Sequence, residues 1–264
     1  DEAMARIVVA ANDDDKLMAM TEYSKVMNEV KAAKAEGERL VDFEGEKIRA
    51  IELKALKELL VVVNEYRQKR AERLRRVLAG ISTLGFGIKP LTFSDLVAHV
   101  EDGNVQILSL DGLDLDKIPE QVLTFSGLKV LTLNDNLLQN LDGLQDLKHL
   151  THLKARRNEI TNLEGIEKIG KLFNLDIAHN KIKKIRILSE LPNLNFLDLS
   201  NNKLAFRELK ILLKMKGLRN VLLGNNPGTK KRWRWGSVGE FIKNLKLKYN
   251  IVVHDFNYSA GDFK

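Results

Sequence analysis

From about residue 105 onward, leucines and polar residues recur in a fixed pattern. Copies of L-x-x-L-x-L-x-x-N-x-L/I follow one another every 22 to 24 residues. The L-x-L core alternates with period two, which predicts a short strand whose leucines all point to one side. No copy can bury its own leucines alone, so the copies must stack. The pattern therefore predicts a curved parallel sheet with room for only a short helical turn behind each strand.

An asparagine recurs three residues after each strand core. Its side-chain amide can bond backbone groups of the turn and of the neighbouring copy, which an apolar side chain cannot do. The first copy is degenerate, because Leu113 stands where the asparagine is expected. We expect a structural ladder formed by Asn136, Asn158, Asn180, Asn202 and Asn226.

These copies, over about residues 91–256, resemble the leucine-rich-repeat superfamily. Their period is similar to that of its short 22-residue class, which includes phosphatase-regulatory subunits, outer-arm dynein light chain one and the spliceosomal A-prime protein. The resemblance implies an α/β leucine-rich-repeat solenoid. The last segment resembles the C-terminal cap of this class through Asn226-Pro227, Trp233-Arg234, Val238, Phe241-Ile242 and Leu245. It departs from that cap at Trp233, where a tyrosine is usual, and at residues 253–255.

The first 90 residues lack the repeat and have helical patterns. Residues 16–36 follow three aspartates that suit a helix N-cap, which predicts a first helix. A second pattern, from Glu46 to Ala79, contains no glycine or proline and predicts one long helix. Its apolar face is wide, as in a packed helix rather than a narrow coiled-coil seam. That face is built around Leu53, Leu56, Leu60 and Val63.

We expect four segments along the chain. Residues 1–81 form a helical extension with one long helix. Residues 82–104 form a linker and an N-terminal cap, in which Leu91–Val100 is a short helix over the first repeat. Residues 105–227 form the repeats, and residues 228–264 form the C-terminal cap and tail.

Composition limits the classes of protein to consider. Lys and Arg total 43 against 36 Asp and Glu, and the net charge of +7 is compatible with nucleic acid or acidic partners but requires neither. The absence of cysteine excludes disulfides, cysteine zinc sites and thiol nucleophiles. No run approaches the roughly 18 apolar residues of a membrane helix, so we expect no membrane insertion. Secreted repeat proteins usually carry disulfides. We therefore expect an intracellular protein that is not secreted: cytoplasmic, or mitochondrial if a leader preceded Asp1.

No motif supports catalysis. The sequence contains no nucleophile elbow, phosphate-binding glycine loop or dinucleotide fingerprint. The five histidines are scattered without the spacing of metal ligands. We therefore expect a protein that is not an enzyme and that has no cofactor, no metal and no small-molecule substrate.

The polar positions around each L-x-L core face the concave side of the predicted solenoid. One interpretation is a partner-binding face, with an aromatic anchor and flanking charges. The alternative is a solvated strand face whose charges neutralise one another. The candidate contacts are His152, Lys154, Arg156, Arg157, Asp176, Asp198 and Phe196.

Two basic clusters lie elsewhere in the sequence. Basic residues beside aromatics can contact phosphates and stack on bases, so both clusters are candidates for RNA or an acidic partner. A solvated helix end is the alternative for the first cluster, and the C-terminal cap is the alternative for Trp233 in the second. The candidates are Arg67, Lys69, Arg70, Arg73, Arg75 and Arg76, and then Lys230, Lys231, Arg232, Arg234 and Trp235.

The hypothesis that these observations favour is a non-enzymatic protein–protein interaction scaffold, a structural or adaptor subunit of a larger assembly. It would bind a partner on the concave face and dock through its N-terminal helices. Two alternatives stay open. One is a ribonucleoprotein subunit, of a spliceosome or an organellar ribosome, that contacts RNA through the basic clusters. The other, which the family resemblance allows, is a regulatory subunit of a phosphatase or a motor.

Overall fold

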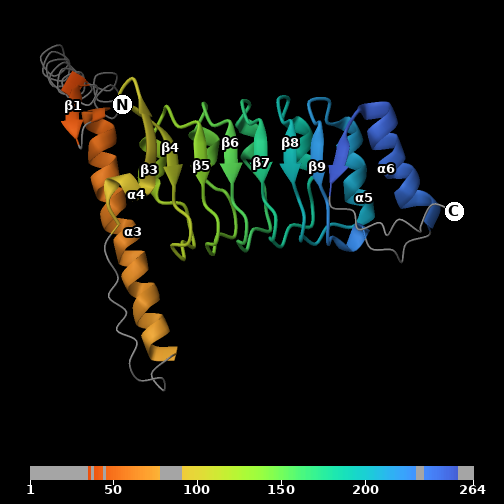
Figure 1. Cartoon of the computed structure of the whole chain (residues 1–264), viewed down its shortest axis with the longest axis horizontal. Helices are drawn as coiled ribbons and strands as arrows, with labels where there is room; N and C mark the ends of the chain where they lie inside the picture. The colour runs from red at the N-terminus through yellow and green to blue at the C-terminus, as the bar shows by residue number, and fades with distance from the viewer. Residues whose placement is uncertain (1–34, 37–38, 44–45, 78–90, 230–234, 255–264) are drawn as a thin grey trace, which may run out of the picture.

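The computed structural model describes residues 35–36, 39–43, 46–77, 91–229 and 235–254. Their main feature is one sheet with the strand order β10-β9-β8-β7-β6-β5-β4-β3, in which all pairs from β4 to β10 are parallel (Figure 1). The protein is an α/β leucine-rich-repeat solenoid, as the family resemblance implies. The strands are β3 (Val97–Glu101), β4 (Asn104–Ser109), β5 (Val130–Thr132), β6 (His152–Lys154), β7 (Asn174–Asp176), β8 (Phe196–Asp198), β9 (Asn220–Leu222) and β10 (Val252–His254).

Short helical turns form the convex side behind the strands. Most of these turns add apolar residues, such as Leu144, Ile166 and Leu188, to the core that the strand leucines fill from the other side. The short repeat leaves no room for longer helices. The turns are η1 (Glu120–Thr124), η2 (Leu144–Asp146), η3 (Ile166–Lys168), η4 (Arg186–Glu190), α5 (Phe206–Leu209), η5 (Lys210–Lys214) and η6 (Pro227–Thr229).

The five repeat asparagines are buried and bind backbone, as the sequence predicts. The side-chain NH₂ of Asn158 donates to the carbonyl of Leu133 in the preceding repeat at 2.8 Å and to that of Ala155 in its own repeat at 3.2 Å. Its side-chain oxygen accepts the N–H of Leu138 at 3.0 Å. Asn136, Asn180, Asn202 and Asn226 repeat the arrangement. The ladder therefore provides hydrogen-bond partners for backbone N–H and C=O groups that would otherwise be buried without one in the leucine core.

The chain leaves each strand through one residue with a left-handed backbone. Asp135, Arg157, His179, Asn201 and Asn225 have φ between 50° and 57°. This conformation brings Cβ close to the following carbonyl oxygen and is unfavourable for most side chains. Asn, Asp and His tolerate it better than the others. Arg157 belongs to none of these types, so its place in the turn carries local strain.

The long N-terminal helix begins later than the sequence predicts. Glu46–Arg49 is strand β2, which pairs with β1 (Leu40–Phe43), and helix α3 runs over Ala50–Val77. The strand lets Ile48 bridge to Gly103 and become fully buried in the repeat core. The expected helix over residues 16–36 lies outside the described residues except for its last two, which are helical.

Helix α3 covers the first repeat and closes the N-terminal end of the core (Figure 1). Leu56 and Val63 of the predicted stripe are fully buried, and Leu53 and Leu60 are partly buried against the same core. The carboxylate of Glu52 is fully buried, accepts the backbone N–H of Val105 at 2.6 Å and pairs with the Arg49 guanidinium at 2.5 Å.

The predicted helix over Leu91–Val100 is wrong for its second half. Only Phe93–Leu96 (α4) is helical, and β3 follows it at once. Strand β3 pairs antiparallel with β4 and so lies at the end of the parallel sheet. Pairing with an open strand edge outweighs the weak helical preference of the β-branched Val97 and Val100.

Helix α6 (Trp235–Tyr249) and β10 close the other end of the core. Phe241 and Leu245 of α6 are buried, and the Phe241 ring meets the Phe206 ring edge to face at 5.5 Å. Strand β10 adds to the sheet beside β9. This arrangement fits the capping role that the resemblance implies for the segment after the last repeat.

Candidate partner-binding face

The strands bring the concave candidates into aligned columns. Lys154, Asp176 and Asp198 lie side by side on β6, β7 and β8. His152 and Phe196 occupy a second column, with Asn174 between them. Because adjacent strands are about 4.8 Å apart, these side chains can meet a single partner segment.

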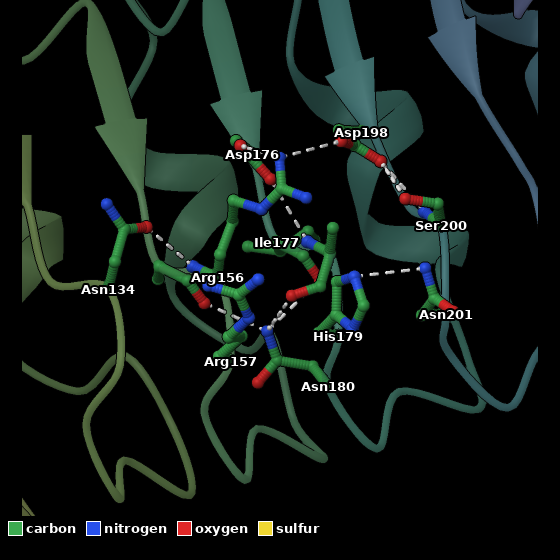
Figure 2. Close-up of polar contacts among 12 residues, drawn as sticks. Asn134, Arg156, Arg157, Asp176, Ile177, His179, Asn180, Asp198, Ser200 and Asn201 are labelled. Carbon is green, nitrogen blue, oxygen red and sulfur yellow. Dashed lines mark hydrogen bonds and ion pairs between the residues drawn. The ribbon is translucent and has the colours of Figure 1, made fainter. Parts of the chain in front are cut away.

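An arginine and two aspartates form a charge triad at the centre of this face (Figure 2). The Arg156 guanidinium lies 3.4 Å from the Asp176 carboxylate and 3.7 Å from that of Asp198. The Asp198 carboxylate also accepts the backbone N–H and the hydroxyl of Ser200, at 2.9 and 2.6 Å. Its side chain is only 4% exposed. The triad is therefore fixed before any partner arrives and carries one net negative charge.

Burial raises the pKa of the Asp176 carboxyl above its ordinary value. The backbone N–H of Ala178, which donates to this carboxylate at 3.2 Å, lowers the pKa, and so does Arg156. The charge of Asp198 raises it further. A partner that covers this face would remove more water from Asp176 and would have to offer it a donor.

Lys154 is an exposed cation of this face that pairs with no carboxylate of the described residues. Arg156 belongs to the triad, and the Arg157 guanidinium lies 3.5 Å from the Asp135 carboxylate. The predicted basic surface around β6 is therefore largely neutralised within the protein. Lys154 itself is exposed and has no ion pair with any residue in the described ranges.

The most exposed aromatic here is Phe173, which the sequence argument missed. Its residue is 46% exposed, whereas Phe196 is partly buried. The Phe173 ring lies 6.3 Å from the His152 ring, and the Phe196 N–H donates to the Phe173 carbonyl at 3.1 Å. The equivalent positions of the other repeats hold Lys129, Thr151, Asn195 and Arg219. An aromatic in an otherwise polar column was a signal that could have identified Phe173.

Hydrogen bonds hold two histidines beside the triad. The Thr151 hydroxyl lies 3.0 Å from the Lys129 carbonyl oxygen and 2.9 Å from Nδ1 of His152, with which it shares a hydrogen bond. At the strand ends, the Asn201 side-chain NH₂ lies 3.1 Å from Nε2 of His179 (Figure 2). In the described part of the chain, no three acidic or histidine side chains gather as a metal site. No described helix is long and apolar enough to cross a membrane.

The first basic cluster is partly used to hold α3 on the repeats. The Arg70 guanidinium donates to the Gly112 carbonyl at 2.5 Å and lies 3.6 Å from the Asp114 carboxylate, which also lies 3.8 Å from Arg73. The Lys69 ammonium lies 5.8 Å from the centre of the Tyr66 ring. The Tyr66 hydroxyl donates to Asp116 at 2.8 Å; burial, and then this bond, raise the tyrosine pKa.

The other members of the basic clusters are described only in part. Arg67 is half-buried on α3. Arg75 and Arg76 belong to the last turn of α3, and Trp235 is the first residue of α6. Lys230, Lys231, Arg232, Trp233 and Arg234 lie outside the described residues.

No protein-family model and no curated protein matches the chain. An internalin of Listeria monocytogenes matches with 23% identity over 54% of this chain and 39% of the other, with a TM-score of 0.44. A second internalin of that organism matches with 28% identity over 45% and 51%, with a TM-score of 0.42. A leucine-rich-repeat protein of Leptospira interrogans matches with 24% identity over 52% and 42%, with a TM-score of 0.44. The chain thus spans about half or less of each of these proteins.

Proposed function

We propose that the protein is a non-enzymatic interaction module, a structural or adaptor subunit of a larger assembly that binds a protein on its concave face. We also propose that its repeats belong to the short 22-residue class. The observation that carries the functional proposal is the exposed Phe173 ring beside the His152 ring, in the repeat whose strand β7 supplies Asp176 to a charge triad that is already fixed. An aromatic anchor on a rigid surface loses little conformational entropy on binding.

The chemistry of the face favours a partner that brings an apolar side chain and a hydrogen-bond donor. The apolar side chain would cover Phe173. The donor would face Asp176, whose burial would increase in the complex. Lys154 adds an exposed cation at the rim, where charge affects orientation and the association rate more than affinity.

The N-terminal part offers a second surface for docking into an assembly. One side of α3 is buried against the repeats, but Ile51 and Val61 on the same helix are 45% and 60% exposed. We propose that these apolar residues, rather than the buried stripe, are available to another subunit.

RNA binding through the first basic cluster and a regulatory role on a phosphatase or motor remain alternatives. The contacts of Arg70 and Arg73 with Asp114 weaken the first alternative, because they give part of that cluster a structural role. The second alternative rests on the family resemblance alone.

The test is affinity purification of the full chain followed by mass spectrometry and a binding assay with the recovered protein. Phe173→Ala with Phe196→Ala should weaken that binding about 30-fold, the equivalent of about 2 kcal/mol, as expected for a hot spot. The control is Leu137→Ala with Leu247→Ala, which removes two exposed apolar side chains that belong neither to the concave face nor to the proposed docking surface of α3. Equal partner binding by both double variants would reject the concave face as the binding surface.

A further inference from the structure

The two ends of the repeat region carry opposite charge. Residues 91–150 contain ten aspartates and glutamates but only three lysines and arginines, whereas residues 181–229 contain three and ten. All ten basic residues of the second segment are exposed. The overall net charge of +7 therefore understates the local excess at the C-terminal repeats.

The positive residues gather on the turns that follow β7 and β8. The basic ridge, as we name it, is formed by Lys183, Lys184, Arg186, Lys203, Arg207 and Lys210. The two turns are neighbours: the Lys203 N–H donates to the Ile182 carbonyl at 2.9 Å, and η4 packs against η5. The ridge thus covers two adjacent repeats on the convex side, away from the concave triad.

The fold does not require positive charge at these positions. In the two preceding repeats the position of Arg186 is held by Asp142 and Glu164. The position of Lys184 is held by Asn140 and Asn162. The backbone of the turn changes as well, because η2 and η3 follow the left-handed Gly143 and Gly165, whereas η4 follows Ile185 at φ −131°. No ion pair with a described residue uses the charge of Lys184 or Arg186, so the change of sign is not explained by contacts within the described fold.

The positive charge of the ridge is mostly uncompensated. Arg207 lies 3.7 Å from the Glu208 carboxylate, while Lys183, Lys184, Arg186, Lys203 and Lys210 have no ion pair with any residue that the structure describes. Like charges on neighbouring turns repel one another, which lowers stability unless an anion binds.

We propose that the basic ridge binds the phosphate backbone of a nucleic acid, with single-stranded RNA as the probe of choice. Several cations along one surface can follow successive phosphates, and each contact releases a counterion. Five of the six ridge residues are exposed and have no carboxylate partner among the residues that the structure describes, so their charge is available for such contacts.

The residue types favour a phosphate backbone over an acidic protein. Lysine is depleted in protein interfaces, which rely on aromatic, methionine and arginine anchors. Four of the six ridge residues are lysines. The large exposed apolar side chains of the described residues all lie outside 181–229, so the ridge has no apolar anchor for a protein. A charged surface of this kind suits a partner whose affinity comes from charge alone.

The experiment measures the anisotropy of a labelled oligouridine of about 20 nucleotides with the full chain, at salt concentrations from about 50 to 200 mM. The ridge variant is Lys183→Glu, Lys184→Glu and Arg186→Glu. It should weaken RNA binding at least about tenfold at low salt. It should also reduce the slope of log affinity against log salt by about two, since each lost phosphate contact removes roughly 0.7.

The matched control makes the same change in net charge elsewhere: Lys117→Glu, Lys148→Glu and Lys168→Glu, all exposed. It should alter RNA affinity by less than about threefold, because distant charges are screened beyond a Debye length. Equal losses in the ridge and control variants would overturn the proposal, and so would wild-type affinity of the ridge variant.

A polyglutamate peptide of matched charge serves as competitor and separates the two classes of partner. Displacement of the RNA by an equal concentration of polyglutamate would overturn the nucleic-acid proposal in favour of an acidic protein. The concave variant with Phe173→Ala and Phe196→Ala should bind RNA like wild type. The test therefore stands independently of the protein-binding function proposed for the concave face.

Discussion

Inward and outward positions of the same strands obey different constraints. The inward column, Leu131, Leu153, Leu175, Leu197 and Val221, is fully buried and hardly varies. The adjacent outward column, Thr132, Lys154, Asp176, Asp198 and Leu222, changes chemical type along the stack. Stacking requires the first column to repeat but leaves the second unconstrained, so the variable column is where recognition can be encoded.

The acidic and basic ends of the repeats show the same division. The acidic end uses some of its charge internally, because Asp114 and Asp116 hold Arg70 and Tyr66 of α3. The basic ridge has no comparable contacts within the part of the chain that the structure describes. Part of the acidic charge is therefore paired within the protein and stabilises the fold, whereas we assign the charge of the basic ridge to binding an external anion.

The largest expected effect separates the inward from the outward column. Leu175→Ala should lower the free energy of unfolding by about 2–5 kcal/mol, because it leaves a cavity among fully buried side chains. Lys154→Ala, on the outward column, should change it by less than about 0.5 kcal/mol. Urea unfolding followed by circular dichroism measures both. Similar losses in the two variants would show that the outward column also holds the fold.

The asparagine ladder gives the next largest effect. Asn180→Leu should lower the free energy of unfolding by about 1–3 kcal/mol. It leaves the buried Ile160 N–H and Ala155 carbonyl, which the side chain binds at 2.9 Å each, without hydrogen-bond partners. The control is Gln139→Leu, which replaces an exposed amide side chain of a repeat turn and should be nearly neutral. The same unfolding assay decides, and a neutral Asn180→Leu would contradict the role of the ladder.

The repeat core could be predicted from sequence because each contact recurs at a fixed spacing. The leucine columns, the asparagine ladder and the order of the parallel strands all follow from one period. The ends of the solenoid could not be predicted in this way. Strand β2 forms because Ile48 bridges to Gly103, and β3 forms because β4 offers an open edge. Neither contact recurs from repeat to repeat, so the period of the sequence does not predict them.

The concave face was predictable in outline only. The period assigned Arg156, Asp176 and Asp198 to neighbouring positions, but it could not show that the arginine reaches across two strands to bind both carboxylates. The period also gave no account of Phe173, which stands just before its strand. Rotamers and burial decide such details, and these depend on neighbours from several repeats.

A smaller effect tests the structural role of the N-terminal arginines. Arg70→Ala should lower the free energy of unfolding by about 1 kcal/mol or less, since its side chain is partly exposed. It should also increase hydrogen exchange in α3, because the contact with Gly112 is lost. Arg207→Ala, at a side chain that is 86% exposed, is the control and should leave α3 protected. Unchanged hydrogen exchange in the Arg70 variant would show that Arg70 does not hold α3 on the repeats, and Arg70 would again be a candidate contact for a nucleic acid or an acidic partner.

The smallest effect concerns Asp176 and depends on pH. Its pKa is raised in the folded protein, so the folded state binds a proton more tightly than the unfolded chain. This contribution to stability is present below the unfolded pKa, near 3.8, and is lost as the pH rises through the folded pKa. At neutral pH the folded state therefore bears the cost of a buried carboxylate. Asp176→Asn removes that charge, and its side-chain oxygen can still accept the Ala178 N–H.

Asp176→Asn should consequently be as stable as wild type at neutral pH or more stable by up to about 1 kcal/mol, and the gap should close below about pH 4. Thermal unfolding between about pH 3 and 7 measures this difference in stability. The control is Asp142→Asn, at an exposed aspartate. A variant that is less stable than wild type at neutral pH would mean that the attraction of Arg156 outweighs burial. A gain in stability would instead mark Asp176 as a residue kept at a cost to the fold, as expected of an outward position selected for a partner.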